Sequence, residues 1–352
     1  MHPRVEKLPK PTPDYHRFLQ VLRREKSDRI PLIELAVHSD VVAALLDEPV
    51  ENAEVVAANV RLMHRLGYDV LKISAPIPFD VQRLAGQDQS ALSTGARAWQ
   101  DQHAGAIGTL DDLERFHWPA KNEIDFTPVE QATRLLPDGM RLLGFSGGVL
   151  EFAMDLIGME RFMFATYDSP ALIEGVVDRV GQIIYDVFAN YCQMDSVCAL
   201  WLGDDLGSKN GLLVSPDVLN TYIVPWYRRF VELAHQHDRP FLLHTCGKTD
   251  AIMPVLINEV GIDAKHSFED AIEPVEQFID TWSTKVATLG GVDVNLLSLG
   301  DEAAIRTRVQ TILNHAAPHG GYALGSGNSI PNYVPPENYL TMIETAAEFN
   351  ER

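Results

Sequence analysis

The chain has 352 residues, with 29 lysines and arginines against 49 aspartates and glutamates, a formal net charge of −20 and a pI near 4.9. A phosphate backbone attracts clustered lysine and arginine, so nucleic acid is not an expected partner, and anionic membrane surfaces are disfavoured for the same reason. With 46% hydrophobic, 8% aromatic and 22% charged residues, the composition is that of a folded globular protein and excludes a largely disordered one.

Neither a membrane span nor a signal peptide is expected from the sequence. No apolar run approaches the roughly 20 residues that cross a bilayer, and the polar, proline-rich residues 1–10 lack the apolar segment of a signal peptide. The three cysteines, Cys192, Cys198 and Cys246, are too few for a disulfide framework and favour a reducing compartment. We therefore expect a cytoplasmic protein in which a cysteine is buried, catalytic or metal-bound.

In chain order, the first predicted elements are a strand at residues 30–35, a helix around residues 51–66 and a strand at residues 69–73. Residues 76–121, with many Gly, Gln and Asp, then form a predicted insertion, which we expect to fold as a small hairpin or lid over the mouth of the fold. From about residue 140, short apolar runs alternate with longer amphipathic stretches. The further predicted strands are residues 140–145, 197–202, 241–244, 263–266, 286–289 and 322–324.

Eight strands alternating with helices, such as those predicted at residues 216–237 and 301–316, match the size and order of an α/β fold of the (β/α)8 TIM-barrel type. We expect a single barrel domain over residues 1–352 with an N-terminal helical extension. The alternative is an open doubly wound sheet. No Gly-x-Gly-x-x-Gly follows a strand and no Gly-x4-Gly-Lys-Ser/Thr occurs, so the nucleotide-binding motifs that would favour the open sheet are missing.

The sharpest local motif is His244-Thr245-Cys246-Gly247, directly after the apolar run at residues 241–243. Side chains alternate in an extended chain, so His244 and Cys246 share a side at the carboxyl end of the strand, where barrel enzymes keep their active sites. An imidazole beside a thiolate is half of a zinc site. The alternative is a strand-capping histidine beside a buried cysteine.

Other predicted strand ends also carry polar groups, in the loops at residues 203–205, 266–270, 290–293 and 325–329. Each acid taken alone is explained as well by a helix cap or a solvated loop residue as by a role in a functional site. Together they crowd the predicted mouth with carboxylates, which suits a metal ion or a cationic group better than a polycarboxylate. The acids are Glu34, Asp204, Asp205, Glu269 and Asp293, and the nearby potential cations are His38, Lys72, His244, Lys248 and His266.

With these motifs, the chain resembles the uroporphyrinogen decarboxylase superfamily, which includes decarboxylases and cobalamin-linked methyltransferases. The resemblance extends over most of the chain and implies a single (β/α)8 barrel. The segments that carry it are residues 17–22, 28–32, 203–207, 215–216, 244–247, 325–328 and 335–338.

The resemblance does not favour a true uroporphyrinogen decarboxylase. Those enzymes carry an Arg-Gln-Ala-Gly-Arg-Tyr loop after the first strand, and this chain has Glu34-Leu35-Ala36-Val37-His38-Ser39 there, without the cationic clamps. Their catalytic aspartate follows the second strand, where this chain reads Ile73-Ser74-Ala75-Pro76, unless Asp80 compensates. Their late Gly-His-Gly corresponds to residues 327–329, which lack the histidine.

The methyltransferase branch resembles the chain more closely because it uses a His-x-Cys pair as zinc ligands, matched by His244 and Cys246. The third family ligand is a cysteine in the late glycine-rich loop, and Asn328 stands at that position. The resemblance therefore implies a metal site completed by a carboxylate such as Glu269, Asp204 or Asp205, a site for a harder metal, or no metal at all.

The leading hypothesis is a zinc-assisted methyltransferase or demethylase that acts on a small substrate with a corrinoid or folate methyl carrier. The alternatives are a lyase of the uroporphyrinogen decarboxylase type, in porphyrin biosynthesis, and a non-catalytic tetrapyrrole-binding protein. A corrinoid protein and a second copy of the chain are possible partners. We expect catalysis from Asp204, Asp205, His266 and Glu269, substrate binding from His38, Lys72, Glu151 and Asn328, and metal binding from His244 and Cys246.

Overall fold

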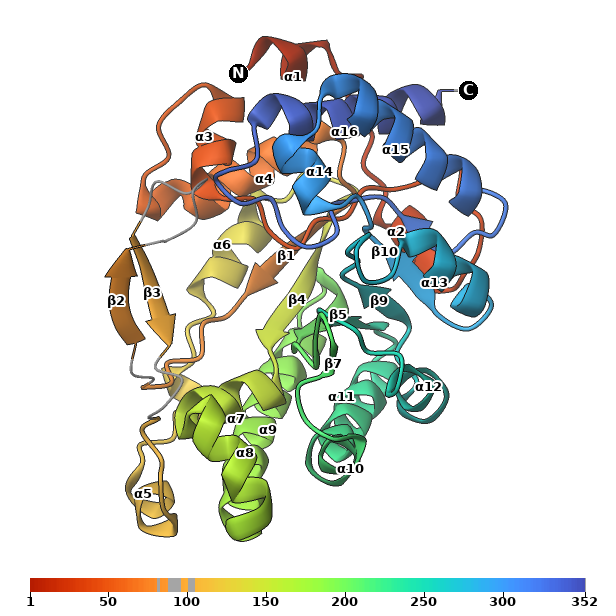
Figure 1. Cartoon of the computed structure of the whole chain (residues 1–352). Coiled ribbons are helices and arrows are strands. Elements are labelled where there is room, and N and C mark those ends of the chain that lie inside the picture. The colour runs from red at the N-terminus through yellow and green to blue at the C-terminus, as the bar shows by residue number, and fades with distance from the viewer. Residues whose placement is uncertain (81–82, 88–95, 101–104, 352) are drawn as a thin grey trace.

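The computed structural model describes residues 1–80, 83–87, 96–100 and 105–351 of the chain. Its centre is a curled sheet of seven parallel strands, hydrogen-bonded in the order β1-β4-β5-β8-β9-β10-β11 and surrounded by helices (Figure 1). Strand β8 coincides with its predicted range. The strands are β1 (Val70–Ser74), β4 (Arg141–Gly147), β5 (Val197–Gly203), β8 (Phe241–His244), β9 (Ala264–His266), β10 (Ala287–Leu289) and β11 (Tyr322–Ala323).

The predicted first strand, residues 30–35, is an extended segment that joins the sheet through isolated bridges and is not a regular strand. Leu32 pairs in parallel with Leu324, and Val37 pairs with Ile330. The Ile33 amide donates to the Leu324 carbonyl, and the Leu324 amide donates to the Pro31 carbonyl, both at 2.9 Å. Pro31 has no N–H to add to this ladder. The segment continues the curl beyond β11, so seven strands and this bridged segment form a TIM-like α/β fold.

Helices cover the outer face of the sheet (Figure 1). Between consecutive strands the chain runs through one or more helical segments, as parallel pairing requires. The helical segments are α1 (Pro3–Lys7), α2 (Tyr15–Leu22), α3 (Ser39–Leu46), η1 (Asn52–Glu54), α4 (Val55–Leu66), α5 (Leu110–Arg115), η2 (Lys121–Glu123), α6 (Thr127–Leu135), α7 (Val149–Ile157), α8 (Met159–Asp168), α9 (Pro170–Cys192), α10 (Pro216–Val218), η3 (Leu219–Ile223), α11 (Val224–Gln236), α12 (Met253–Val255), η4 (Leu256–Val260), α13 (Val275–Trp282), α14 (Val294–Leu299), α15 (Glu302–Ala316) and α16 (Pro336–Asn350).

The helix predicted over residues 216–237 is divided into three parts. Short α10 leads into a π-helical turn, η3, before α11 begins at Val224. Pro225 has no N–H for the i→i−4 ladder, and its ring would clash with the carbonyl four residues earlier. The wider π turn just before Pro225 accommodates this interruption.

Two small hairpins lie outside the main sheet. Strands β2 (Arg83–Gln87) and β3 (Ala96–Gln100) pair antiparallel within the predicted insertion at residues 76–121. Strands β6 (Gly207–Ser208) and β7 (Gly211–Leu212) pair antiparallel in the loop after β5. A hairpin therefore forms in the insertion as expected, and its use as a lid stays a prediction.

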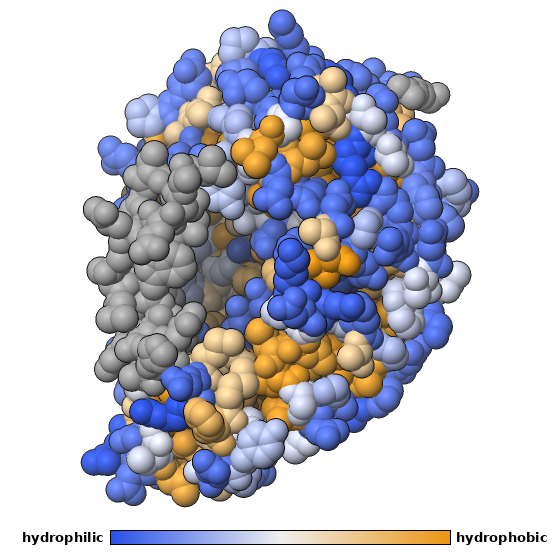
Figure 2. Space-filling model, in the orientation of Figure 1, coloured by the Kyte–Doolittle hydropathy of each residue, from blue (hydrophilic) through white to orange (hydrophobic). Residues whose placement is uncertain are grey.

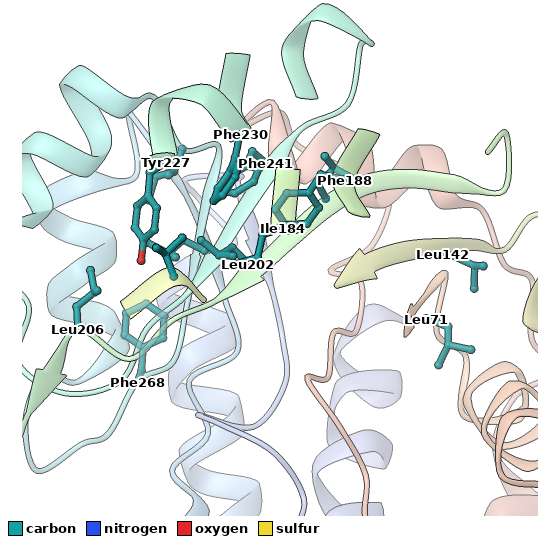
Figure 3. Packing of buried hydrophobic residues seen from close by; sticks show 14 of the residues in the cluster. Leu71, Leu142, Ile184, Phe188, Leu202, Leu206, Tyr227, Phe230, Phe241 and Phe268 are labelled. Carbon is teal, nitrogen blue, oxygen red and sulfur yellow. The ribbon is translucent and has the colours of Figure 1, made fainter. Parts of the chain in front are cut away.

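Two hydrophobic layers hold the fold together. Inside the sheet, Val70, Leu143 and Trp201 pack with residues of the other strands, above the buried face of α2. Outside it, aromatic rings join α9, α11 and β8: the centroid of Phe188 lies 5.4 Å from that of Phe230 and 5.7 Å from that of Phe241 (Figure 3). Edge-to-face pairs of this kind stabilise a fold by about 0.5–1.5 kcal/mol beyond the burial of their area.

The two termini lie at the same end of the molecule (Figure 1). Arg4 of α1 donates to Glu344 of α16 through Nε at 2.8 Å and Nη2 at 2.6 Å, which ties the N-terminal extension to the last helix. Within the described residues, none of the helices combines the length and apolar character that crossing a bilayer requires.

Candidate metal and substrate site

The His-x-Cys motif lies at the carboxyl end of β8. His244 is the last residue of that strand and is paired in register with His266 of β9. The Cys246 Sγ atom lies 3.4 Å from His244 Nε2. The expectation that alternation places the two side chains on one side of the chain is confirmed.

Asp205 completes a cluster of three possible metal ligands. Its Oδ1 atom lies 3.7 Å from His244 Nε2 and accepts a hydrogen bond of 2.9 Å from the Cys246 backbone N–H. The carboxylate, imidazole and thiol ligand atoms all lie within 4.8 Å of one another. Of the described residues, one other group meets this geometry, the surface set Asp280, His315 and His319 between α13 and the end of α15.

The spacing of the Asp205, His244 and Cys246 atoms is close to that of a zinc site. With Zn–N and Zn–O bonds near 2.0–2.1 Å and Zn–S near 2.3 Å, a tetrahedral ion holds N and O roughly 3.3–3.4 Å apart and S and N roughly 3.5–3.6 Å apart. The observed S–N and N–O separations are 3.4 and 3.7 Å, so small side-chain movements would complete the geometry. Three protein ligands would leave a fourth position for a substrate, as in catalytic zinc sites.

The protonation states of the cluster bear on metal binding. Burial lowers the pKa of His244 to about 4; the charges of Lys265 and Lys72 act in the same direction and that of Asp205 opposes it, so the ring is neutral at pH 7. Burial and the Asp205 carboxylate raise the pKa of Cys246, so its thiol stays protonated without a metal. A neutral imidazole is ready to bind a cation, and a metal would displace the thiol proton.

Asn328 and Ser267 also contact the sulfur. Asn328 Nδ2 and Ser267 Oγ each lie 3.3 Å from Cys246 Sγ as donors. Both groups can stabilise a thiolate by hydrogen bonding. Asn328 thus reaches the cluster from the late glycine-rich loop, at the position where the methyltransferase branch was expected to place a third cysteine.

His266 supports His244 from β9. The two Nδ1 atoms lie 2.7 Å apart, and the His266 ring is fully buried. If His244 Nε2 binds a metal, its Nδ1 must carry the proton and donate it to His266 Nδ1. His266 then carries its own proton on Nε2, and a hydrogen bond with the Ser326 backbone offsets part of the burial that lowers the pKa of this ring.

Asp204, adjacent to Asp205, has a different position. Its fully buried carboxylate accepts from the Leu150 and Glu151 amides, at 2.9 Å each, and from the Tyr227 hydroxyl at 2.7 Å. Burial raises its pKa to about 6 against these three donors. The side chain therefore caps the start of α7 and lies outside the three-ligand cluster, whereas Asp205 belongs to it.

Of the remaining predicted site residues, Glu151 lies beside Asp205, whereas the others lie outside the three-ligand cluster. Glu269 is exposed and lies outside the three-ligand cluster, and His38 accepts from the Asp40 amide at the start of α3. Glu151 lies in the first turn of α7; desolvation, with added repulsion from Asp204 and Asp205, raises the pKa of its carboxyl to about 9. Lys72 on β1 places its ammonium 4.3 Å from the centroid of the Phe145 ring.

Two residues at the site were not predicted. Lys265, buried inside β9, donates to the Ser267 carbonyl, and its Nζ lies 3.8 Å from the centroid of the Phe268 ring. Ser267 has a positive φ of 90°, a conformation that is costly for a residue with a Cβ, and this turn directs its hydroxyl to Cys246. Lys265 could have been predicted, because a lysine within a short apolar strand indicates a buried polar contact. The backbone conformation of Ser267 has no such signal in the sequence.

The fold and cluster together define an α/β protein of the TIM-barrel type, with a cluster of side chains that could hold a metal ion at the carboxyl end of its sheet. The profile of the uroporphyrinogen decarboxylase (URO-D) family matches residues 14–349, so the chain belongs to this family. The expected resemblance is thereby confirmed.

Two relatives illustrate the range of the similarity. A uroporphyrinogen decarboxylase of Trichlorobacter lovleyi is 22% identical over 263 residues, which cover 70% of this chain and 72% of that protein. The solved structure of a methyltransferase from Methanosarcina mazei superposes with a TM-score of 0.70 at 18% identity, over 95% of this chain and 98% of that one. The structural likeness supports the shared fold. Members of the family are enzymes.

Proposed function

We propose that this chain is a zinc-assisted methyltransferase or demethylase on a (β/α)8 barrel, which moves a methyl group between a small substrate and a corrinoid or folate carrier. The observation that carries the proposal is the cluster of Asp205, His244 and Cys246, whose separations suit a tetrahedral ion. The similarity to the Methanosarcina methyltransferase supports the same class.

In this proposal Asp205, His244 and Cys246 would hold the ion. Bound zinc would supply a Lewis acid that lowers the pKa of a substrate thiol, so that a thiolate is available at neutral pH. In the transfer, a lone pair of the sulfur forms the bond to the methyl carbon, and the electron pair of the broken bond stays with the carrier. The thiol proton leaves to solvent.

The surrounding side chains would hold the ligands in place. His266 orients the His244 ring through the 2.7 Å contact between their Nδ1 atoms. Asn328 and Ser267 donate hydrogen bonds to the Cys246 sulfur, which stabilise its negative charge and fix the orientation of the side chain. Lys265 fixes the carbonyl of Ser267 and with it the strained turn that presents the hydroxyl.

The experiment combines zinc analysis with a turnover assay. Methylcobalamin, and separately 5-methyltetrahydrofolate, would serve as methyl donors to a series of thiols, with donor demethylation followed by absorbance. We expect the double variant His244→Ala/Cys246→Ala to lose both zinc and turnover. The control is His235→Ala, which changes a half-exposed histidine of α11 and should retain both. Loss of zinc with unchanged turnover in the double variant would contradict the proposal.

The second candidate is a decarboxylase acting on uroporphyrinogen, favoured by the curated relative. Against it, the segment after residue 33 reads Glu34-Leu35-Ala36 and has no arginine, and both Asp204 oxygens already accept protein hydrogen bonds. Incubation with uroporphyrinogen decides between the two: release of carbon dioxide with formation of coproporphyrinogen would establish the lyase. Tight pigment binding without conversion would instead support the tetrapyrrole-binding alternative.

A further inference from the structure

Lys72 is a cation inside the curled sheet. On β1, Val70 packs into the inner layer and Leu71 into the outer one, so Lys72, two residues after Val70, turns inward again. Its ammonium lies 4.3 Å from the centroid of the Phe145 ring on the neighbouring β4. The charge lies near enough to the three-ligand cluster to lower the pKa of His244.

This cation has no anionic partner among the described residues. The ion pairs and hydrogen bonds of the described chain include no carboxylate within reach of Lys72 Nζ, although acids outnumber bases 49 to 29. Burial lowers the pKa of Lys72 to about 8, so most molecules still carry the charge at pH 7. Holding a charge here without a counter-ion is costly, and a bound anion would offset that cost.

The space beside Lys72 suits a small ligand. A cavity of about 270 Å³ opens between residues 34–37, α4 and β1, with Lys72 and Ser74 in its lining. Glu34 lines the same cavity, but burial raises the pKa of its carboxyl to about 8, so it is mostly uncharged at pH 7. The surface is hollowed over the region where Figure 1 draws β1 and β4 (Figure 2). On the inner wall of the sheet, Phe145 lies beside Lys72 and meets the fully buried Trp201 edge to face, with centroids 6.1 Å apart.

Lys72 and the metal cluster are at opposite ends of this wall. Their strands, β1 and β8, are separated by β4 and β5 in the sheet. With neighbouring strands about 4.8 Å apart, three spacings amount to roughly 14 Å along the curl, and the direct path across the inside is shorter.

We infer that Lys72 binds the carboxylate of the substrate, which is therefore a small monocarboxylic acid whose other end reaches Asp205, His244 and Cys246. The inference rests on the proposed function, because the metal cluster defines the reacting end. A single cation pairs with a single carboxylate, so this site does not suit a polycarboxylate substrate.

The test compares benzoate with its neutral analogue benzamide by titration calorimetry at pH 7. The wild-type protein should bind benzoate at least about tenfold more tightly, because a hydrogen bond to a charged group contributes roughly this much or more. The preference should be lost in Lys72→Met and kept in Lys72→Arg, which retains the charge. Lys285→Met, which removes an exposed lysine that bonds Asn258, is the matched control and should keep the preference.

Equal affinities for the two probes in the wild type, or a preference that survives in Lys72→Met, would overturn the inference. Thermal unfolding of each variant confirms that it is folded. Zinc content, measured on the same samples, separates the two proposals. Lack of zinc with an intact benzoate preference rejects the metal-assisted function alone, and bound zinc without the preference rejects the carboxylate site alone.

Discussion

At the scale of single residues, two adjacent aspartates have different surroundings. Asp204 accepts three hydrogen bonds at the start of α7, and Asp205 lies beside His244 and Cys246. The sequence predicted acids at this strand end but could not assign them, because the direction of each side chain depends on where β5 stops and how the next loop turns. For the same reason the sequence could not show that Glu269 is exposed and lies outside the cluster.

We expect Asp205→Asn to weaken zinc binding by more than about 100-fold, since the loss of a partner behind a metal ligand already costs 10- to 100-fold. Asp204→Asn should leave zinc affinity nearly unchanged and lower the free energy of unfolding by about 1–3 kcal/mol, because its amide nitrogen would face backbone donors. Chelator competition and urea unfolding measure the two effects. Similar zinc affinities in the two variants would refute the assignment of Asp205 to the metal and of Asp204 to the start of α7.

Asn328→Cys adds a thiol at the position where the resemblance to the methyltransferase branch implies one. Asn328 Nδ2 already lies 3.3 Å from Cys246 Sγ, so a thiolate at this position would reach the same ion. We predict tighter zinc binding, by at least about tenfold, and a smaller effect of Asp205→Asn in the Asn328→Cys background. Asn328→Ser, which offers no thiolate, is the control. An unchanged affinity in Asn328→Cys would place Asn328 outside the metal's reach.

At the scale of elements, Glu34 joins the bridged first segment to the loop after β11. Its buried carboxyl accepts from the Ser326 backbone N–H at 3.2 Å and from the Ser326 hydroxyl. Burial raises the pKa of Glu34 to about 8 from an ordinary value of 4.5. The loop that carries Asn328 is therefore attached to the other edge of the curled sheet by a carboxyl that is mostly protonated at pH 7.

This pKa predicts how stability depends on pH. A raised pKa means that the folded state holds the proton more tightly, so the stabilising contribution is complete below pH 4.5 and is lost as the pH rises towards 8. Relative to Glu34→Gln, the wild type should lose on the order of 3 kcal/mol between pH 4.5 and pH 7. Denaturant unfolding at several pH values measures the difference. A parallel pH dependence in the two proteins would contradict it, and Glu51→Gln, on the surface, should match the wild type.

Strands were easier to predict than the breaks within elements. Apolar runs of four to seven residues located β4, β5 and β8 to within about a residue or two, because burial on both faces of a parallel strand leaves an uninterrupted apolar signal. The first segment was predicted as a strand, yet Pro31 limits it to isolated bridges. The π turn before Pro225 was missed because helical periodicity continues across it.

At the scale of the whole molecule, the net charge of −20 should destabilise the compact state through self-repulsion. Raising sodium chloride from 20 to 200 mM at pH 7.5 screens these charges and should raise the unfolding midpoint by roughly 1–3 °C. Near pH 5, close to the pI of about 4.9, the effect should shrink because much of the repulsion is gone. An equal salt effect at both pH values would show that repulsion is not its source.

More of the fold than of the candidate site could be predicted from the sequence. Alternation of strands and helices over 352 residues predicted the TIM-like arrangement, since periodicity reports burial. The closeness of the His244 and Cys246 side chains was also predicted, because the two residues are close in sequence. The contacts of Asp205, Ser267 and Asn328 with this pair join separate loops, and loop conformation is not encoded in a periodic pattern.

Elemental mass spectrometry on protein purified without chelator shows whether Cys246 binds a metal. We predict about one zinc per chain in the wild type and in Cys192→Ala, which alters a buried cysteine of α9, and none at this site in Cys246→Ala. His319→Ala should be measured alongside, so that zinc on the surface cluster is counted separately. Equal zinc in Cys246→Ala and the wild type, or none in any folded sample after zinc reconstitution, would contradict the account.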